Sequence, residues 1–257
     1  MTQNEMNILV PAKLKEIEEQ HNIKVLLAVE SGSRAWGFAS PDSDFDVRFI
    51  YKRPRNKYLE LNKSRDVIEL PIDDTWDVNG WDLDKTLRLL FKSNPTLFEW
   101  LNSPICYCKT DFTEKIMPLT SEYFSIKNTL YHYLNTARNN IKTFLQGETV
   151  RPKKYFYAIR PILACLWVLE KKTPPPVLFD DLTSAMLPEN LLSSLDYLLD
   201  IKINSPEKVE IKPIKDIDDF LNQNIVLLDN TMKDLPKEVH KSWDLINSYF
   251  IYEIENN

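Results

Sequence analysis

The stretch ESGSRAWGFASPDSDFDVRFIY, residues 30–51, concentrates residues that could bind a metal and a phosphate. It holds two of the chain's four glycines, Gly32 and Gly37, and Asp44 and Asp46 follow them. Residues i and i+2 of a strand project from the same face, so both carboxylates can bind one hard cation. Mg²⁺ takes one or two protein carboxylates and completes its shell with water and substrate phosphate oxygens. The pair therefore predicts a site for Mg²⁺ or Mn²⁺.

Gly32 and Ser33 directly follow KVLLAVE, an apolar run typical of a buried strand. A glycine there lets the backbone turn sharply and approach a ligand closely. Backbone N–H groups beside a helix start bind phosphate oxygens, and the Ser33 hydroxyl can add a hydrogen bond. Arg34 is placed to reach a triphosphate, although a surface salt bridge is an equal alternative. A plain turn is the alternative for the glycine and serine.

This spacing of G-S and D-x-D resembles that of the DNA-polymerase-beta-like nucleotidyltransferase superfamily. The full stretch is more specifically similar to the RNA-ligase-associated polymerase-beta-like family, the RlaP or YcgL-type proteins. Three later segments extend the resemblance to about residue 170, namely DVNGWDLDKTLRLLFKSNPTLFEWLNSP, HYLNTARNN and KKYFYAIRPILACLW. The resemblance implies a Mg²⁺-dependent (or Mn²⁺-dependent) enzyme that moves a nucleoside monophosphate from a nucleoside triphosphate to an acceptor hydroxyl. RNA is one candidate acceptor.

The superfamily also implies a third carboxylate on a neighbouring strand. Arg48 and the residues around Lys154 have more than one interpretation. Asp77 is our choice for the third catalytic and metal-binding carboxylate, with Asp74 and Asp82 as alternatives and Asp82 equally suited to cap a helix. Arg48 either neutralises the aspartate pair or contacts phosphate. The resemblance makes Lys154 a candidate triphosphate contact. Lys154 belongs to a basic and aromatic cluster at a helix start, which could contact phosphate or nucleic acid or could form an ordinary solvated helix end. The other members are Lys153, Tyr155 and Arg160.

A non-catalytic nucleotide-binding regulator, or an antitoxin-like partner, is the main alternative function. Such a protein would keep the phosphate cradle and lose turnover, so the third carboxylate distinguishes it from an enzyme. A glycosyltransferase that holds a nucleotide sugar with D-x-D does not explain the upstream glycine–serine turn.

The elements that would position these residues change in character along the chain. Strands are expected at 24–30 and 44–51, and 65–72 and 74–81 form two more strands or one strand with a break. Helices are expected at 11–20, 83–93 and 95–101. Helical spacing then dominates in 121–146, 153–171, 189–200 and 238–253. These patterns predict an α+β protein. Residues 1–112 would form a nucleotidyltransferase domain with a small mixed sheet flanked by helices, and residues 113–257 a helical domain.

Composition excludes some classes of partner. The net charge of −6 argues against a polycation that coats nucleic acid. The first residues lack a signal-peptide pattern, and no apolar run is long enough to span a bilayer. The three cysteines, Cys106, Cys108 and Cys165, suit reduced thiols. We therefore expect a cytoplasmic protein that does not bind a membrane.

Overall fold

The computed structural model describes residues 2–40, 43–71, 76–205, 209–236 and 241–256, and it has the predicted α+β character. The chain forms two compact units. The sheet unit comprises Met1–Ala35, Asp44–Phe124 and His240–Asn257, and the helical unit comprises Trp36–Ser43 and Ser125–Val239. The predicted division into a nucleotidyltransferase domain, 1–112, and a helical domain, 113–257, stays a prediction.

The sheet unit is built on a mixed sheet. Over the described residues this sheet has five strands in the order β3-β4-β2-β1-β5. Only β2 and β4 pair in parallel among these neighbours; the other pairs are antiparallel. The strands are β1 (Lys24–Glu30), β2 (Phe45–Lys52), β3 (Val67–Glu69), β4 (Trp76–Asp82) and β5 (Cys106–Lys109). The helices are α1 (Gln3–His21), α2 (Gly32–Trp36, its last residue in the helical unit), α3 (Arg55–Tyr58), α4 (Leu83–Phe91), α5 (Pro95–Leu101), α6 (Phe112–Tyr123) and α12 (Asp244–Glu255).

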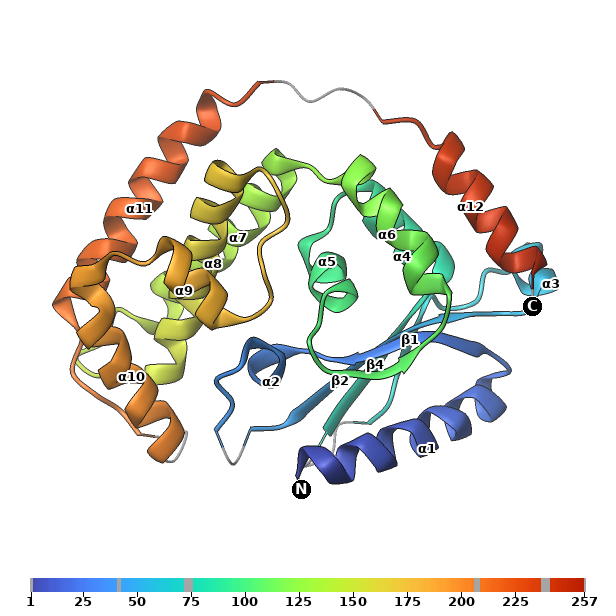
Figure 1. The fold of residues 1–257 in the computed structure, drawn as a ribbon, viewed down its shortest axis with the longest axis horizontal. Helices are drawn as coiled ribbons and strands as arrows, with labels where there is room; N and C mark the ends of the chain where they lie inside the picture. The colour runs from blue at the N-terminus through green and yellow to red at the C-terminus, as the bar shows by residue number, and fades with distance from the viewer. Residues whose placement is uncertain (1, 41–42, 72–75, 206–208, 237–240, 257) are drawn as a thin grey trace. The chain divides into compact units, whose positions relative to one another are not determined.

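Helices cover both faces of this sheet (Figure 1). On one face α1 packs against alternate residues of β2, because successive side chains of a strand point to opposite faces. Phe45, Val47 and Phe49 belong to this layer. On the other face Ile50 of β2 joins a cluster with residues of α4, α5, α6 and α12. The odd-numbered residues of β2 therefore face α1, and Asp46 and Arg48 point to the face that α4, α5 and α6 cover.

The strands predicted at 24–30 and 44–51 are confirmed as β1 and β2, and the described parts of 65–81 contain the short strand β3 and the longer strand β4, while residues 72–75 lie outside the described residues. The helix predicted at 11–20 begins at Gln3, because Thr2 and Glu5 form a capping box and Pro11 lies inside the helix. Asp82 caps α4 by accepting from the amide of Asp84 at 3.1 Å. The sequence analysis missed β5, whose short CYCK sequence lacks a long alternating pattern, and α6, which contains Pro118.

The helical unit is built around the paired helices α7 and α8. Phe38 of the segment 36–43 packs in this unit, with its ring centroid 4.8 Å from Phe156 and 5.1 Å from Phe179. The sequence analysis missed α9 and α11. None of the helices in the described ranges combines the length and the apolar character that a membrane crossing requires. The elements are α7 (Ile126–Phe144), α8 (Pro152–Lys171), α9 (Phe179–Met186), the 3₁₀ turn η1 (Glu189–Leu191), α10 (Leu192–Asn204) and α11 (Lys215–Lys233).

Candidate active site

Two neighbouring strands bring two of the predicted carboxylates together. The parallel register of β2 and β4 sets Asp46 opposite Asp77. Both side chains are half-buried, and both contact the same arginine. Asp77 therefore lies beside Asp46 on a neighbouring strand, where the third carboxylate was predicted.

Arg48 bridges these two carboxylates. Its Nη2 donates to Oδ1 of Asp46 and to Oδ2 of Asp77, at 2.8 Å in each case. Its Nη1 donates to the backbone oxygens of Asp77 at 2.8 Å and of Val47 at 3.1 Å. These contacts show that Arg48 offsets the negative charges of Asp46 and Asp77. A contact between Arg48 and phosphate stays a prediction. Because the guanidinium takes one oxygen of each carboxylate, the second oxygen of each is left for another partner.

Gly32 lies directly against Asp46. Its φ is +62°, in the left-handed region that favours glycine. A Cβ on this residue would lie 2.2 Å from Oδ2 of Asp46. The amide of Ser31 donates to the backbone oxygen of Asp46 at 2.9 Å, which fixes this close approach. Only glycine leaves space for the Asp46 carboxylate here.

Ser33 and Arg34 lie in the short helix α2, which begins at Gly32. The Arg34 Nε donates to the backbone oxygen of Asp44 at 3.1 Å, and its guanidinium lies 3.7 Å from the centroid of the Phe45 ring. Arg34 thereby ties α2 to the start of β2. Ser33 is half-buried. Gly32, Ser33 and Arg34 thus lie in one turn that approaches Asp46 through Gly32, and their phosphate contacts stay predictions.

Asp44 is exposed and lies just before β2, which begins at Phe45. The pKa of Asp46 is raised, chiefly by burial and further by the charges of Asp77 and Asp44, while Arg48 opposes the rise. A cation bound between these carboxylates would relieve their mutual repulsion.

The sequence analysis missed Glu30, the residue directly behind Asp46. Glu30 is 0% exposed, and its Oε1 accepts from the amide of Asp46 at 2.7 Å. Its Oε2 accepts from the Tyr107 hydroxyl at 2.5 Å. Burial raises the pKa of Glu30 to about 7, although both hydrogen bonds favour the ionised form. The available signal was a carboxylate that ends a buried apolar strand directly before the glycine–serine turn.

The other two candidates for the third carboxylate were Asp74 and Asp82. Asp74 lies outside the described residues. Asp82 pairs in register with Tyr51, five residues beyond Asp77 along β4, which corresponds to roughly 16 Å of strand. Its Oδ2 accepts from Arg53 at 2.9 Å, in addition to the cap on α4.

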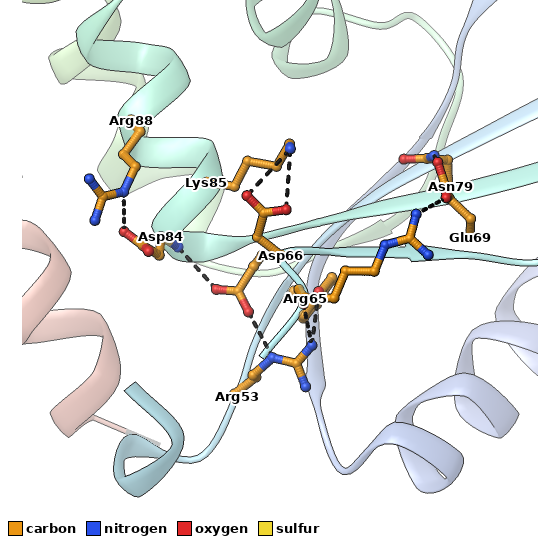
Figure 2. A network of polar contacts seen from close by, with 10 residues as sticks. Arg53, Arg65, Asp66, Glu69, Asn79, Asp84, Lys85 and Arg88 are labelled. Atoms are coloured by element: carbon orange, nitrogen blue, oxygen red, sulfur yellow. Dashed lines mark hydrogen bonds and ion pairs between the residues drawn. The ribbon is translucent and has the colours of Figure 1, made fainter. Parts of the chain in front are cut away.

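A network of ion pairs lies at that end of β4 (Figure 2). Arg88 donates to Asp84 at 2.8 Å, Lys85 approaches Asp66 at 3.4 Å, and Asn79 donates to Glu69 at 3.1 Å. Cationic and anionic groups are matched here, as in a structural ion-pair network.

Lys154 lies in the helical unit, on α8. Its ammonium is 3.6 Å from the centroid of the Phe144 ring and borders a cavity of about 430 Å³ with Arg151 and Glu210. Its contact with a triphosphate stays a prediction. The alternative of a solvated helix end is wrong for two of its neighbours, because Tyr155 and Arg160 are buried. The Arg160 guanidinium lies 4.4 Å from the centroid of the Trp36 ring.

The model of the RNA repair pathway DNA polymerase beta family matches residues 6–252. The chain belongs to this family. The uncharacterized protein YcgL of Bacillus subtilis (strain 168) is 42% identical over 245 residues, which cover 95% of this chain and 94% of that protein. These matches confirm the resemblance seen in the sequence, and general nucleotidyl transfer is the class of activity that the family supports.

Two solved structures are weakly similar in fold. Spectinomycin adenyltransferase AAD(9) from Enterococcus faecialis, solved with ATP and spectinomycin, has a TM-score of 0.43 at 12% identity and covers 87% of this chain and 98% of its own. A nucleotidyltransferase-like protein from Exiguobacterium sibiricum 255-15 has a TM-score of 0.31 at 13% identity and covers 93% of this chain and 77% of its own.

The residues around Asp46 suit a hard divalent cation. The donors are carboxylate oxygens, and Gly32 leaves the Oδ2 side of Asp46 open where a Cβ would fill it. Within the described ranges, no group of three or more His, Cys, Asp or Glu side chains is gathered closely enough to hold a metal. Mg²⁺ does not need such a group, because one or two carboxylates together with water and phosphate oxygens complete its shell.

Proposed function

We propose that the protein is a Mg²⁺-dependent or Mn²⁺-dependent nucleotidyltransferase that moves a nucleoside monophosphate from a nucleoside triphosphate to an acceptor hydroxyl. Asp44 and Asp46 would hold the metal that binds the triphosphate, and Asp77 would contact metal on the side of the acceptor hydroxyl. A bound divalent cation would supply positive charge to the triphosphate oxygens during displacement. The observation that carries the proposal is the pairing of Asp46 with Asp77 beside the empty side-chain position of Gly32.

Residues of the chain would activate the acceptor and bind the triphosphate. Asp77 would orient the acceptor hydroxyl and take its proton while the acceptor oxygen bonds to the α-phosphorus. The bond from that phosphorus to the bridging oxygen breaks, and pyrophosphate leaves. Gly32 and Ser33 would bind the β- and γ-phosphates, and Arg34 and Lys154 would contact the triphosphate.

The acceptor that we propose first is an RNA end. The support is the description of the family, which belongs to an RNA repair pathway. A protein hydroxyl and a small molecule are the other acceptors that the experiment includes.

The position of Asp77 supports an enzyme over a non-catalytic regulator. A protein that only binds nucleotide does not need a carboxylate that activates an acceptor hydroxyl. In this structure Asp77 lies opposite Asp46 and shares Arg48 with it.

The test is to incubate the protein with each labelled nucleoside triphosphate, Mg²⁺ or Mn²⁺, and total cellular RNA and protein, and to identify the labelled fraction. Asp77→Asn should lower transfer by roughly two orders of magnitude, the scale of a lost general base, and leave nucleotide affinity nearly unchanged. Asp82→Asn is the control and should leave transfer intact. Nucleotide binding by the wild type without transfer to any acceptor would establish the regulator instead.

A further inference from the structure

The two carboxylate oxygens, the amide and the backbone oxygen of Glu30 each make a hydrogen bond. Its carboxylate accepts from the Asp46 amide at 2.7 Å and from the Tyr107 hydroxyl at 2.5 Å. Its own amide donates to the backbone oxygen of Ile105 at 2.9 Å, and its backbone oxygen accepts from the Ser103 hydroxyl at 2.6 Å. A buried carboxylate with this many partners has a fixed position and orientation.

Tyr107 extends this arrangement to a second element. Its hydroxyl accepts from Nε2 of Gln3, in the first turn of α1, at 3.1 Å. Tyr107 lies on β5 and Glu30 on β1, which are paired neighbours in the sheet. One chain of hydrogen bonds thus runs from α1 through β5 and β1 to the amide of Asp46.

The peptide groups of Asp46 depend on this region for their partners. The amide of Asp46 donates to the Glu30 side chain, and its carbonyl accepts from the amide of Ser31. Asp46 sits at the start of β2, where the regular ladder with β1 has ended at the pair of Glu30 and Val47. At Asp46 the Glu30 side chain therefore supplies the hydrogen bond that a ladder partner would otherwise make. The Asp46 carboxylate itself contacts Arg48 and lies against Gly32.

We propose that Glu30 and Tyr107 are positioning residues that fix the backbone of Asp46, so that its carboxylate stays aimed at the metal and Asp77. This inference rests on the proposed function. Glu30 and Tyr107 lie on the α1 side of the sheet, with Gln3, whereas the Asp46 carboxylate points to the opposite face. Neither residue would touch substrate. They would act by fixing the backbone of Asp46, in the way that groups hydrogen-bonded to a metal ligand orient that ligand.

The variants separate the two hydrogen bonds. Glu30→Ala removes the acceptor for the Asp46 amide, whereas Glu30→Gln keeps an oxygen there. Tyr107→Phe removes only the hydroxyl donor. Tyr155→Phe is the matched control, because that buried hydroxyl also donates to a carboxylate, Asp218 at 3.0 Å, and accepts from a backbone amide, but lies in the helical unit.

The first measurement needs neither metal nor turnover. In the metal-free protein, amide exchange at Asp46 should be faster in Glu30→Ala and Tyr107→Phe than in the wild type. It should stay near the wild-type rate in Glu30→Gln and Tyr155→Phe. An unchanged Asp46 exchange rate in Glu30→Ala and Tyr107→Phe overturns the proposal.

The second measurement is the Mn²⁺ concentration that gives half-maximal ATP binding. It should rise about tenfold in Tyr107→Phe and at least as much in Glu30→Ala, the scale found when a partner of a metal ligand is removed. It should stay near wild type in Glu30→Gln and Tyr155→Phe, and excess Mn²⁺ should restore ATP binding in Tyr107→Phe. A merely structural defect would reduce the amount of folded protein without moving this midpoint.

The outcomes distinguish this inference from the proposed function. If the wild type binds no ATP with Mn²⁺, the proposed function fails and the role toward the metal fails with it. If the wild type binds ATP normally and Tyr107→Phe leaves the Mn²⁺ midpoint unchanged, the positioning role alone is wrong. If Glu30→Ala does not fold, Tyr107→Phe and Glu30→Gln decide the question.

Discussion

At residue 32 the backbone has φ +62°, and a Cβ would fall 2.2 Å from Oδ2 of Asp46. Gly37 has φ +91°, but among the described residues a Cβ there would meet only Leu178, at 3.5 Å. Alanine at either position should cost about 1–2 kcal/mol of unfolding free energy, because both leave a side chain in the left-handed region. Gly32→Ala alone should also lose Mn²⁺-dependent ATP binding, because it must displace Asp46.

Urea unfolding and calorimetric titration of Mn²⁺ and ATP on both variants measure the two effects separately. Equal loss of ATP binding in Gly32→Ala and Gly37→Ala would attribute the effect to the backbone and not to the space beside Asp46.

The buried carboxyl of Glu30 makes stability depend on pH. Its pKa is raised from 4.5 to about 7, so between these values the folded protein keeps a proton that the unfolded chain has released. Stability from this group is therefore fully present below pH 4.5 and is lost as the pH rises through about 7. The difference of about 2.5 in pKa corresponds to on the order of 3 kcal/mol. Burial is the main cause of the raised pKa of Glu30. The hydrogen bonds from Tyr107 and the Asp46 amide and the charge of Arg34 oppose it, and the charge of Asp46 adds to it.

Urea unfolding without divalent cations, from pH 4.5 to above 7, should show this decline in the wild type. Glu30→Gln cannot ionise, so its decline should be smaller by that amount. Parallel curves for the two proteins would mean that Glu30 titrates near its ordinary value in the fold.

At the scale of elements, the parallel register of β2 and β4 brings two like charges together, and Arg48 offsets them. Arg48→Met should therefore destabilise the metal-free protein, since like charges that lie opposite each other on a sheet repel. Mg²⁺ should restore much of this loss, because a cation between Asp46 and Asp77 replaces the missing positive charge.

The measurement is the rise in melting temperature on saturation with Mg²⁺. It should be larger in Arg48→Met than in the wild type, and it should vanish in Arg48→Met combined with Asp46→Asn. An equal rise in all three proteins would place the Mg²⁺ effect elsewhere.

The sequence predicted the elements whose signal is local. The alternation of Phe45, Val47 and Phe49 predicted β2, and the helix starts predicted at residues 83 and 95 are correct. Asp46 followed from the same alternation. The pairing of β2 with β4 depends on which strands meet in the fold, so the sequence suggested Asp77 only through the family resemblance. Glu30 could not be assigned for the same reason, because its partner Tyr107 lies 77 residues away.

At the scale of the whole molecule, the chain enters and leaves each unit more than once. Residues 36–43, between the glycine–serine turn and Asp44, belong to the helical unit, and α12 at the end of the chain belongs to the sheet unit. A local pattern reports whether a segment is a helix, and it does not report which unit that helix joins. The sequence analysis therefore assigned 238–253 to the helical part, although Ile246 of α12 lies in the core beside α4.

Lys52 of β2 attaches this last helix to the sheet. It is 5% exposed, and its ammonium donates to the backbone oxygens of Glu253 and Asn256 at 2.7 Å each. These oxygens belong to the end of α12, where carbonyls lack partners within the helix and favour a cation. Lys52→Met keeps much of the apolar stem and removes both hydrogen bonds. Burial lowers the pKa of Lys52, because burying its charge costs free energy. The two hydrogen bonds offset part of that cost.

We expect Lys52→Met to cost about 1–3 kcal/mol of unfolding free energy, the scale for hydrogen bonds to a charged group. Because Lys52 holds the last carbonyls of α12, the amides of α12 should show the largest rise in hydrogen exchange, and those of α7 and α8 should not change. Lys115→Met is the control, since that lysine pairs with exposed Asp111 and lies 4.7 Å from the centroid of the Tyr252 ring of α12 without reaching its last carbonyls. Exchange that rises equally throughout both units would show that Lys52 supports the fold as a whole and not the attachment of α12.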